Sequence, residues 1–479
     1  HLRVIFNMVL QSGVAPQEWG TAVVKLLEKP GRDHAKWTGY RCISLVSCVA
    51  KLFERCMKVR IEMRVHKHAT SDRQYGFRPG WAAEDALLAH AATTGMGKTE
   101  AEAGGKVYSC YLDVRRAFPS MDRRAMLVRL YKEGKVTGRV WRVVANMYKD
   151  VKPQIWQGEA KGPTYNVGTG AREGSVLSPI CYSAFIDGMI GAVEAAVDND
   201  GTPAGAAVAG HGNLYFATSA FCDDFVMSSD TPTGLQAMMD AAGAYANEHL
   251  FAFGREKTNV IVFGSSGAPM RWRNKEGRMV SGWTMPALYK ESPDEDDAVE
   301  CKDSYVYMGV KMHRDRSWRH HHEMVAKAHG RLKAQAIRDR ATGAAGCGGP
   351  VAVMIWNATA TGALDRAALA TAASDATAKA RNEEYGKIEK LSRAAAKNEI
   401  GGRHNGPTEV AYEEAGIKST RDRREAAQAK AAFRVMRMPA KQPVRKLLTA
   451  AAADKTVLGK GWHRAATAAC KAASGELGK

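Results

Sequence analysis

Apolar residues along this chain follow two different spacings, which predicts a fold with both helices and strands. Where they recur every three or four positions we expect helices, and short runs rich in β-branched and aromatic residues predict strands. We therefore expect an α+β fold. The predicted helices cover residues 2–10, 51–57, 84–92, 122–130, 140–148, 180–197 and 235–249. The predicted strands cover residues 21–27, 40–46, 107–114, 154–156, 259–263 and 305–310.

A further strand pair, predicted within residues 214–227, contains two adjacent carboxylates among apolar and aromatic residues. Buried carboxylates are costly unless a base, a proton or a metal ion neutralises them. An Asp-Asp turn is also an ordinary loop, so Asp223 and Asp224 alone do not define a site. A third carboxylate, Asp113, ends the predicted strand 107–114. Carboxylates from different strands that meet at one point can hold two divalent ions, so these residues are candidate metal ligands.

Two longer regions differ from this pattern. Residues 264–303 form a polar excursion, and we expect its acidic run at 293–297 to be a solvated loop. From residue 319 the chain becomes rich in alanine and basic residues, with helical periodicity to about residue 398. A Gly-Gly break at 401–402 then precedes another basic helical segment.

Composition narrows the class of partner and compartment. The 479 residues carry a net charge of +19, which favours a polyanionic partner such as nucleic acid. The nine cysteines are scattered without a Cys-x-x-Cys pair, which argues for reduced thiols inside a cell and against a structural zinc site. The sequence has no apolar run of about 18 residues, so we expect a soluble protein. Because the chain opens at His1 within a predicted helix, we expect a fragment of a longer polypeptide.

Two motif-like segments are weak candidates for sites. Residues 92–99 fit a relaxed phosphate-loop spacing, but a helical pattern precedes them where that motif requires a strand. His320, His321 and His322 are adjacent and point to different faces of a helix, so we favour a solvated cluster over a metal site.

Two other segments suit contact with a ligand. Lys29 and Arg41 flank one strand–loop–strand connection and could clamp a phosphate chain, although solvated loop charges fit equally well. The glycine cluster at 168–174 lacks the spacing of a dinucleotide fingerprint, and a backbone that a ligand approaches closely fits it better.

Together and in this order, the blocks resemble the reverse transcriptases of non-LTR (LINE-type) retrotransposons, from about residue 19 to residue 309. The blocks that carry the resemblance are residues 29–31, 40–45, 74–80, 112–118, 172–179, 221–224, 257–258 and 307–309. The resemblance implies a right-hand polymerase with fingers, a palm built on an antiparallel sheet, and a helical thumb. The expected domains are fingers at 1–104, a palm at 105–312 with some finger elements and the 264–303 insertion, a helical thumb at 313–400 and a basic helical tail at 401–479.

The resemblance also implies an activity: an RNA-directed DNA polymerase that extends a DNA primer 3′ end on an RNA template with dNTPs. Asp113, Asp223 and Asp224 would bind two Mg²⁺ ions, or Mn²⁺ in their place, with Asp224 the less direct ligand. Lys257 would donate a proton to pyrophosphate. The residues expected to contact substrate are Lys29 and Arg41 at the triphosphate, Phe118 against the sugar, and Arg78, Glu173 and Gly174.

Further expectations follow from the same resemblance. Residues 307–309 would grip the primer, and the basic tail would add contacts to phosphates. Other domains of a longer element-encoded polypeptide would be partners, with no membrane involved. We expect an intracellular protein that acts in the nucleus.

Several residues depart from the family pattern. Pro119 stands where an aspartate is usual, Gly254 where an asparagine is usual, and Glu173 where a glutamine helps to position the nucleotide. A carboxylate near a triphosphate is repelled unless it is protonated or paired, for example with Arg172. An alternative hypothesis is therefore a catalytically inactive scaffold that binds RNA. An unrelated nuclease would lack the ordered blocks.

Overall fold

The computed structural model describes most of the chain up to residue 327 and one later segment. The described residues are 1–325 except 30, 32, 37–38, 99, 150, 158, 173, 209–210, 266–270 and 293, together with 327 and 420–453. Glu173 and nearly all of the predicted thumb therefore lie outside the described residues.

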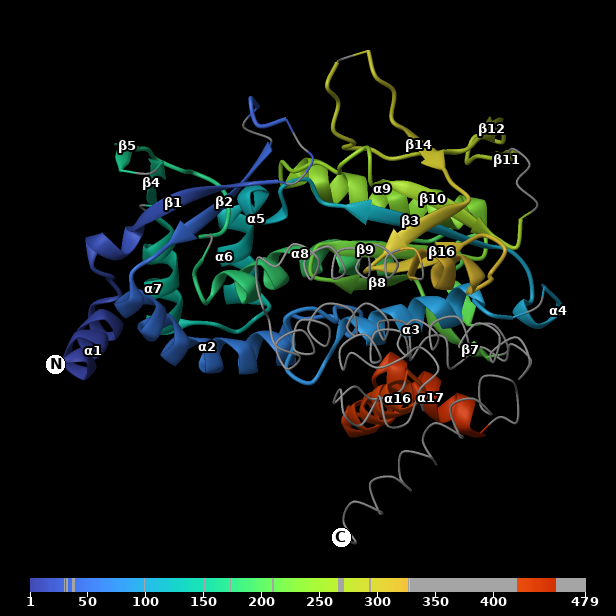
Figure 1. Ribbon diagram of the computed structural model, residues 1–479, viewed down its shortest axis with the longest axis horizontal. Coiled ribbons are helices and arrows are strands. Elements are labelled where there is room, and N and C mark those ends of the chain that lie inside the picture. The colour runs from blue at the N-terminus through green and yellow to red at the C-terminus, as the bar shows by residue number, and fades with distance from the viewer. Residues whose placement is uncertain are drawn as a thin grey trace, which may run out of the picture.

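The larger sheet has six strands in the order β13–β14–β10–β3–β9–β8 (Figure 1). Its central strand β3 is antiparallel to both β9 and β10, which confirms the predicted antiparallel palm sheet. The strands are β13 (Trp283–Thr284), β14 (Ala298–Cys301), β10 (Asn259–Phe263), β3 (Val107–Asp113), β9 (Asp224–Ser229) and β8 (Thr218–Phe221).

Residues of β3 alternate between two cores, one on each face of the sheet. Tyr108, Cys110 and Leu112 join the core formed with α8 (Ser178–Glu194) and α9 (Pro232–Glu248). Val107 and Tyr111 join a second core that includes Leu87 and Ala91 of α3 (Ala83–Thr94). Since successive strand residues point to opposite faces, an apolar run such as 107–112 requires cover on both sides. Figure 1 shows α9 and α3 on opposite sides of the sheet.

Several helices around the sheet begin after a residue whose side chain caps the helix N-terminus. Ser47 caps α2 by accepting a hydrogen bond from the Ala50 N–H, and Asp122 caps α6 through the Arg124 and Ala125 N–H groups. Thr231 caps α9, whose first residue, Pro232, needs no backbone donor. The bounds of α2 are Cys48–His68 and those of α6 are Arg123–Lys132; two further helices are α1 (Leu2–Ser12) and α7 (Gly138–Lys149).

A second sheet of four strands, in the order β2–β1–β4–β5, combines two distant parts of the chain. Its strands are β2 (Tyr40–Leu45), β1 (Thr21–Glu28), β4 (Lys152–Gln157) and β5 (Ala160–Thr164). The fingers sheet thus takes half of its strands from the segment assigned to the palm. Conversely, α3 lies within residues 1–104 but packs on the palm sheet. The domain limits themselves stay predictions.

Two predicted segments contain more structure than the sequence indicated. The polar excursion 264–303 includes strands, because β14 pairs with β10 and β13 with β14, whereas residues 294–297 of its acidic run lie outside any helix or strand. Trp283 and Met285 of this excursion are buried and provide apolar contacts. The mostly polar composition of residues 264–303 concealed these two residues. The single strand predicted at 305–310 is a hairpin of β15 (Ser304–Tyr307) and β16 (Val310–His313). Met308 and Gly309 have positive φ values and form its turn.

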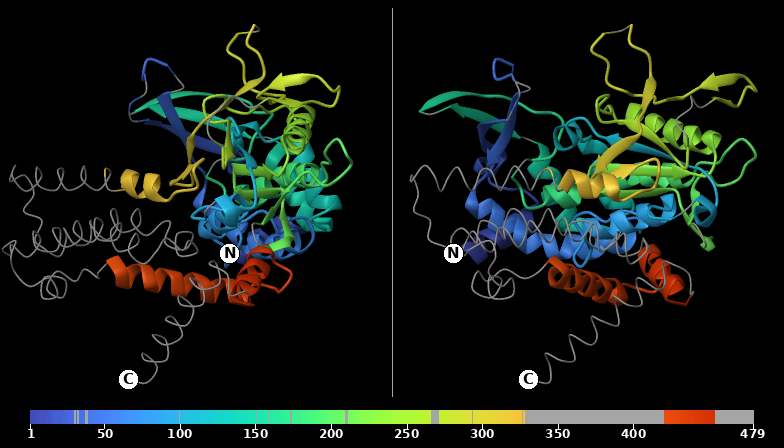
Figure 2. Two further views of the ribbon diagram at one scale, coloured as in Figure 1. Left: turned by 90° about the vertical axis from the view of Figure 1, so that its right-hand side faces the viewer. Right: turned by 45° about the vertical axis from the view of Figure 1, so that its right-hand side comes forward.

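Two helices near the C-terminus, α16 (Thr420–Arg437) and α17 (Pro443–Ala453), pack beside α3 (Figures 1 and 2). Ala432, Val435 and Leu447 share a core with Leu88 and Ala89 of α3. Arg434 also forms a 2.6 Å ion pair with the buried Asp85. This part of the basic tail therefore binds the body of the protein. Within the described helices, none combines the length and apolar character that a membrane crossing requires.

The described part contains several short elements besides these. They are η1 (Gln17–Gly20), α4 (Glu100–Ala103), α5 (Ala117–Ser120), β6 (Ala206–Val208), β7 (His211–Phe216), β11 (Arg271–Arg273) and β12 (Met279–Ser281). The segment 92–99 begins in the last turn of α3, so a helix stands where a phosphate loop needs a strand, as the sequence indicated.

Candidate active site

Strand pairing brings the predicted acidic residues to one end of the palm sheet. Asp113 is the last residue of β3 and lies directly opposite Asp224, the first residue of β9. Asp223 precedes it in the two-residue turn between β8 and β9. Residues that face each other in an antiparallel pair have Cα atoms about 4.5–5.5 Å apart. Three carboxylates from two neighbouring strands therefore share one edge.

The charge on this edge is incompletely neutralised. Burial raises the pKa of Asp223 and raises that of Asp224 to about 6, and the neighbouring aspartates add to both effects. Lys257 donates a 2.8 Å hydrogen bond to Asp113, and this bond is the main cause of the raised pKa of Lys257. Among the described residues, the carboxylate oxygens of the three aspartates do not all come within 4.8 Å of one another.

The turn that carries Asp223 is held by a buried glutamine. Cys222 has φ 62°, a left-handed conformation that is unfavourable for a residue with a side chain. Gln74 stabilises it, because its Oε1 accepts a 3.0 Å hydrogen bond from the Cys222 N–H and its Nε2 donates to the Cys222 carbonyl. Gln74 is fully buried, and the same Oε1 accepts from the Gly76 N–H. Gln74 is thus a positioning residue for the Asp-Asp turn.

The neighbouring backbone leaves room only for glycine at residue 76. A Cβ atom there would collide with the backbone and sulfur of Cys222. The Tyr75 N–H and the Ala220 carbonyl form a 2.8 Å hydrogen bond that fixes this segment along β8. The block at residues 74–80 contributes to the family resemblance, but the sequence did not indicate the function of the Gln74 side chain. The feature that could have indicated it is an amide side chain within an apolar, glycine-rich turn.

Phe118 lies on an aromatic platform close to the same edge. Its ring stacks on Tyr182 with centroids 4.9 Å apart and meets Phe77 edge to face. Arg116, with φ 52°, is the N-terminal cap of α5, the single helical turn that carries Phe118. Pro119 is accommodated within this one-turn helix. The Phe118 ring is thus supported by Tyr182 of α8, which would hold it rigidly enough to exclude a group by steric contact.

Arg172 and Gly174 serve the protein's own packing. Arg172 is buried and forms a 3.3 Å ion pair with Glu54, which is also buried. The same carboxylate accepts hydrogen bonds from Ser175 and from the Val176 N–H. The Arg172 guanidinium thus bonds to Glu54, whereas its pairing with Glu173 stays a prediction, because Glu173 lies outside the described residues. Gly174 allows a close approach by the Ser44 carbonyl of β2, and its contact with substrate stays a prediction.

The remaining predicted substrate residues fall into two places. Lys29 and Arg41 are neighbours at one end of the β1–β2 hairpin, since Arg41 pairs with Leu27 and the Lys29 N–H bonds to the Gly39 carbonyl. Arg78 is nearly buried and donates to the carbonyls of Ser71 and Gln74. Those contacts organise the loop before α3, and a contact of Arg78 with substrate stays a prediction.

Gly254 contacts the first aspartate directly. Its N–H donates a 2.8 Å hydrogen bond to the Asp113 carbonyl. A Cβ atom at 254 would lie 3.0 Å from Oδ2 of Asp113, so any larger residue would require that carboxylate to shift. The departure from the family's asparagine therefore changes the surroundings of a candidate metal ligand.

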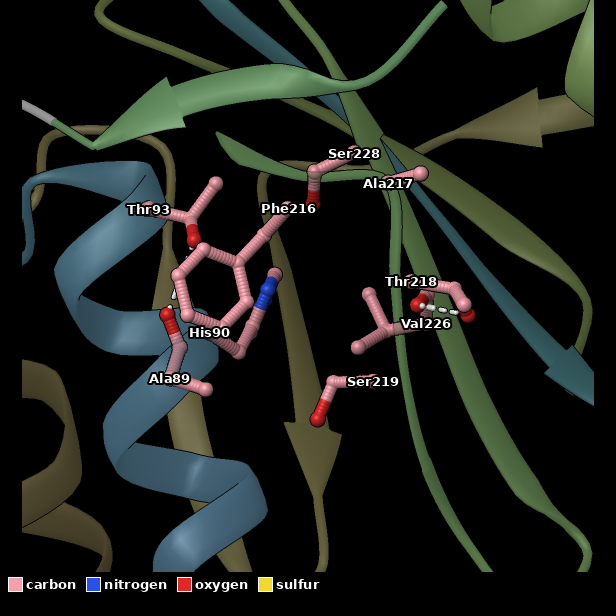
Figure 3. A pocket seen from close by; sticks show the side chains of 9 residues that line it. All are labelled: Ala89, His90, Thr93, Phe216, Ala217, Thr218, Ser219, Val226 and Ser228. Atoms are coloured by element: carbon pink, nitrogen blue, oxygen red, sulfur yellow. Dashed lines mark hydrogen bonds between the residues drawn. The ribbon is translucent and has the colours of Figure 1, made fainter. Parts of the chain in front are cut away.

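The cavity drawn in Figure 3 is part of the packing layer and not of this edge. It lies between α3 and strands β8 and β9, with His90, Thr93 and Phe216 among its lining residues. His90 forms a 2.8 Å hydrogen bond with Tyr111, and burial lowers its pKa to about 3. It is a neutral core histidine.

A family model described as reverse transcriptase (RNA-dependent DNA polymerase) matches residues 27–312. The chain belongs to the reverse transcriptase family. This confirms the family predicted from the ordered blocks. Members of this family generally use divalent metal ions.

Curated relatives come from non-LTR retrotransposons. A probable RNA-directed DNA polymerase from transposon X-element of Drosophila melanogaster is 24% identical over 190 residues, covering 40% of this chain and 20% of the relative. A retrovirus-related Pol polyprotein from type-1 retrotransposable element R2 of Nasonia vitripennis is 24% identical over 270 residues, covering 56% of this chain and 24% of the relative. This reverse transcriptase chain thus spans about a fifth to a quarter of the relatives' length. A solved telomerase from Candida albicans superposes with a TM-score of 0.41 at 8% identity, over 93% of this chain and 64% of that one.

Proposed function

We propose that this chain is an RNA-directed DNA polymerase that extends a DNA primer 3′ end on an RNA template with dNTPs. The observation that carries the proposal is the pairing of Asp113 with Asp224 across β3 and β9, with Asp223 in the adjoining turn. Family membership supports the reaction class. The excess of basic over acidic residues suits nucleic-acid partners.

The three aspartates would hold the divalent ions, which we propose are two Mg²⁺ ions. The donor set fits this group, since it is made of oxygen ligands whose charge Lys257 only partly offsets. When bound, the ions would activate the primer hydroxyl and stabilise the leaving pyrophosphate. Gln74 keeps Asp223 at the tip of its turn, and the Gly254 N–H fixes the backbone of Asp113.

Other side chains have roles that follow from their positions. Lys257 can donate a proton near the carboxylates, because its ammonium is held there by Asp113. The Phe118 ring, braced on Tyr182, would exclude a 2′-hydroxyl and so favour deoxynucleotides. Lys29 and Arg41 would approach the triphosphate from the fingers sheet, and the turn at Met308–Gly309 would contact the primer.

We also propose where the protein acts and that it is part of a longer polypeptide. A primer end in genomic DNA implies action in the nucleus. The coverage of the relatives supports further domains in a longer element-encoded polypeptide.

The deciding experiment is primer extension on an RNA template with Mg²⁺ and dNTPs. We expect extension by the wild-type chain, none by Asp223→Asn, and normal extension by Asp240→Asn, which removes a carboxylate on α9 away from the edge. The inactive-scaffold alternative predicts salt-sensitive RNA binding without extension, even after Glu173→Gln restores the usual residue. That outcome would reject the polymerase.

A further inference from the structure

A second group of metal-binding side chains lies where the palm gives way to the helix that begins at residue 319. His313 is the last residue of β16, Asp315 lies in the following turn, and His320 lies in the first turn of the helix. One ligand atom from each lies within 4.8 Å of the others. His313 Nδ1 and His320 Nε2 each lie 2.8 Å from a different oxygen of the Asp315 carboxylate.

This finding corrects the expectation of a solvated histidine triplet at 320–322. His321 is buried, and its Nδ1 accepts a 3.3 Å hydrogen bond from the Lys311 N–H of β16. Only His320 of the triplet joins the cluster. Its neighbours there come from outside the triplet, and for that reason the sequence pattern did not reveal them.

The three side chains of the cluster offer ligand atoms that could hold one metal ion. The His313 and His320 rings are stacked with centroids 3.6 Å apart and an interplanar angle of 18°. Two imidazole nitrogens and one carboxylate form a donor set typical of zinc-class ions.

The cluster is held in place by contacts that do not depend on an ion. Arg316, buried and with φ 61°, donates to the Thr94 carbonyl at the end of α3, and its own carbonyl accepts from the Gly97 N–H at 2.6 Å. The Ser317 N–H donates to Asp315 at 2.9 Å. The ligand side chains are 17–42% exposed, which leaves access for an ion and for water as a further ligand.

We propose that His313, Asp315 and His320 bind one transition-metal dication of the zinc class, separately from the catalytic aspartates. The bound ion would tie the helix at 319 to the β15–β16 hairpin. That hairpin contacts the palm sheet, because the Tyr307 hydroxyl donates to the Ser219 carbonyl of β8. An ion here would therefore fix the direction in which the chain leaves the palm.

The test is titration of the metal-stripped full chain with Zn²⁺, and with Co²⁺ as a spectroscopic probe, in excess Mg²⁺ to occupy oxygen-ligand sites. We expect one equivalent of Co²⁺ to bind with the absorption of a nitrogen-ligated ion, and Zn²⁺ to raise the melting temperature. Removal of a ligand by His313→Ala, Asp315→Asn or His320→Ala should weaken binding by at least about tenfold.

The matched control is His249→Ala, which removes a histidine paired with a single aspartate, Asp122. It should bind Zn²⁺ as the wild type does. Circular dichroism of each variant before metal addition verifies that it is folded, and Asp315→Asn serves as the mildest change. Absence of Co²⁺ binding by the wild type, or equal affinity in folded ligand variants and wild type, would overturn the proposal and leave a hydrogen-bonded His-Asp-His cluster.

Discussion

Two groups of carboxylates in this protein have the same chemistry and opposite surroundings. Glu54 is buried, and its two oxygens receive a guanidinium, a hydroxyl and a backbone N–H. Asp113, Asp223 and Asp224 share one edge, where Lys257 bonds to Asp113 and acts on the other two only through its charge, which lowers their pKa values. A fully satisfied acid stabilises a fold, whereas an under-satisfied group of acids is suited to bind a cation. Glu54 therefore has a structural role, whereas the three aspartates are suited to a catalytic one.

The largest expected effect is on activity at the under-satisfied edge. Asp223→Asn should lower the rate of primer extension at least about 1000-fold, or about 4 kcal/mol in barrier, because a metal ligand is lost. The folded protein should lose no stability. Extension kinetics together with thermal unfolding measure both, and a loss of activity that merely followed unfolding would break the comparison.

Removing the satisfied acid should have the opposite profile. Glu54→Ala leaves the buried Arg172 without its carboxylate, which should cost about 3 kcal/mol in the free energy of unfolding. Urea unfolding of Glu54→Ala, Arg172→Met and the double variant measures this. The double variant should be less destabilised than the sum of the two single changes. Strict additivity would show that the pair is not coupled.

An intermediate effect is expected for the residue that positions the Asp-Asp turn. Gln74→Ala removes the hydrogen bonds that hold Cys222 at positive φ, and should reduce kcat by about 10–100-fold with a weaker apparent affinity for Mg²⁺. Gln442→Ala is the control, because that glutamine is also buried but bonds to Asp72 near α17. If both variants lost activity equally, the role of Gln74 would be one of general stability.

The smallest effect concerns Asp187, a buried acid between the two extremes. Burial raises its pKa to about 7, although Arg129 lies 3.8 Å away and the Ser71 N–H donates to it. Because the folded pKa lies above the unfolded one, the folded state holds more protons in between. Stability should therefore fall as pH rises from about 4 through 7.

Asp187→Asn should remove that dependence, a difference on the order of 1 kcal/mol between pH 5 and 8. Urea unfolding at both pH values tests it. Parallel pH profiles for the wild type and Asp187→Asn would show that this carboxyl does not titrate in the folded protein.

Sequence patterns predicted the positions of the acidic residues better than they predicted the buried residues that hold the surrounding structure in place. Asp113 and Asp224 could be placed because strand ends and a hairpin turn are local features, and antiparallel pairing then brings them together. Gln74 and Glu54 act on residues more than 100 positions away, and no periodicity reveals such partners. The turn at Met308–Gly309 was missed because the apolar residues of two short strands read as one. The sequence pattern did not reveal the candidate metal site at His313 and His320, because the turn between them brings the end of β16 next to the helix that begins at residue 319.

The most direct test of the account is thermal unfolding with and without Mg²⁺. Without metal, the repulsion among Asp113, Asp223 and Asp224 should make the wild type less stable than Asp223→Asn. Added Mg²⁺ should raise the melting temperature of the wild type and leave that of Asp223→Asn nearly unchanged. Equal shifts in both proteins, or a metal-free Asp223→Asn variant less stable than the wild type, would contradict the claim that this edge is an under-neutralised metal site.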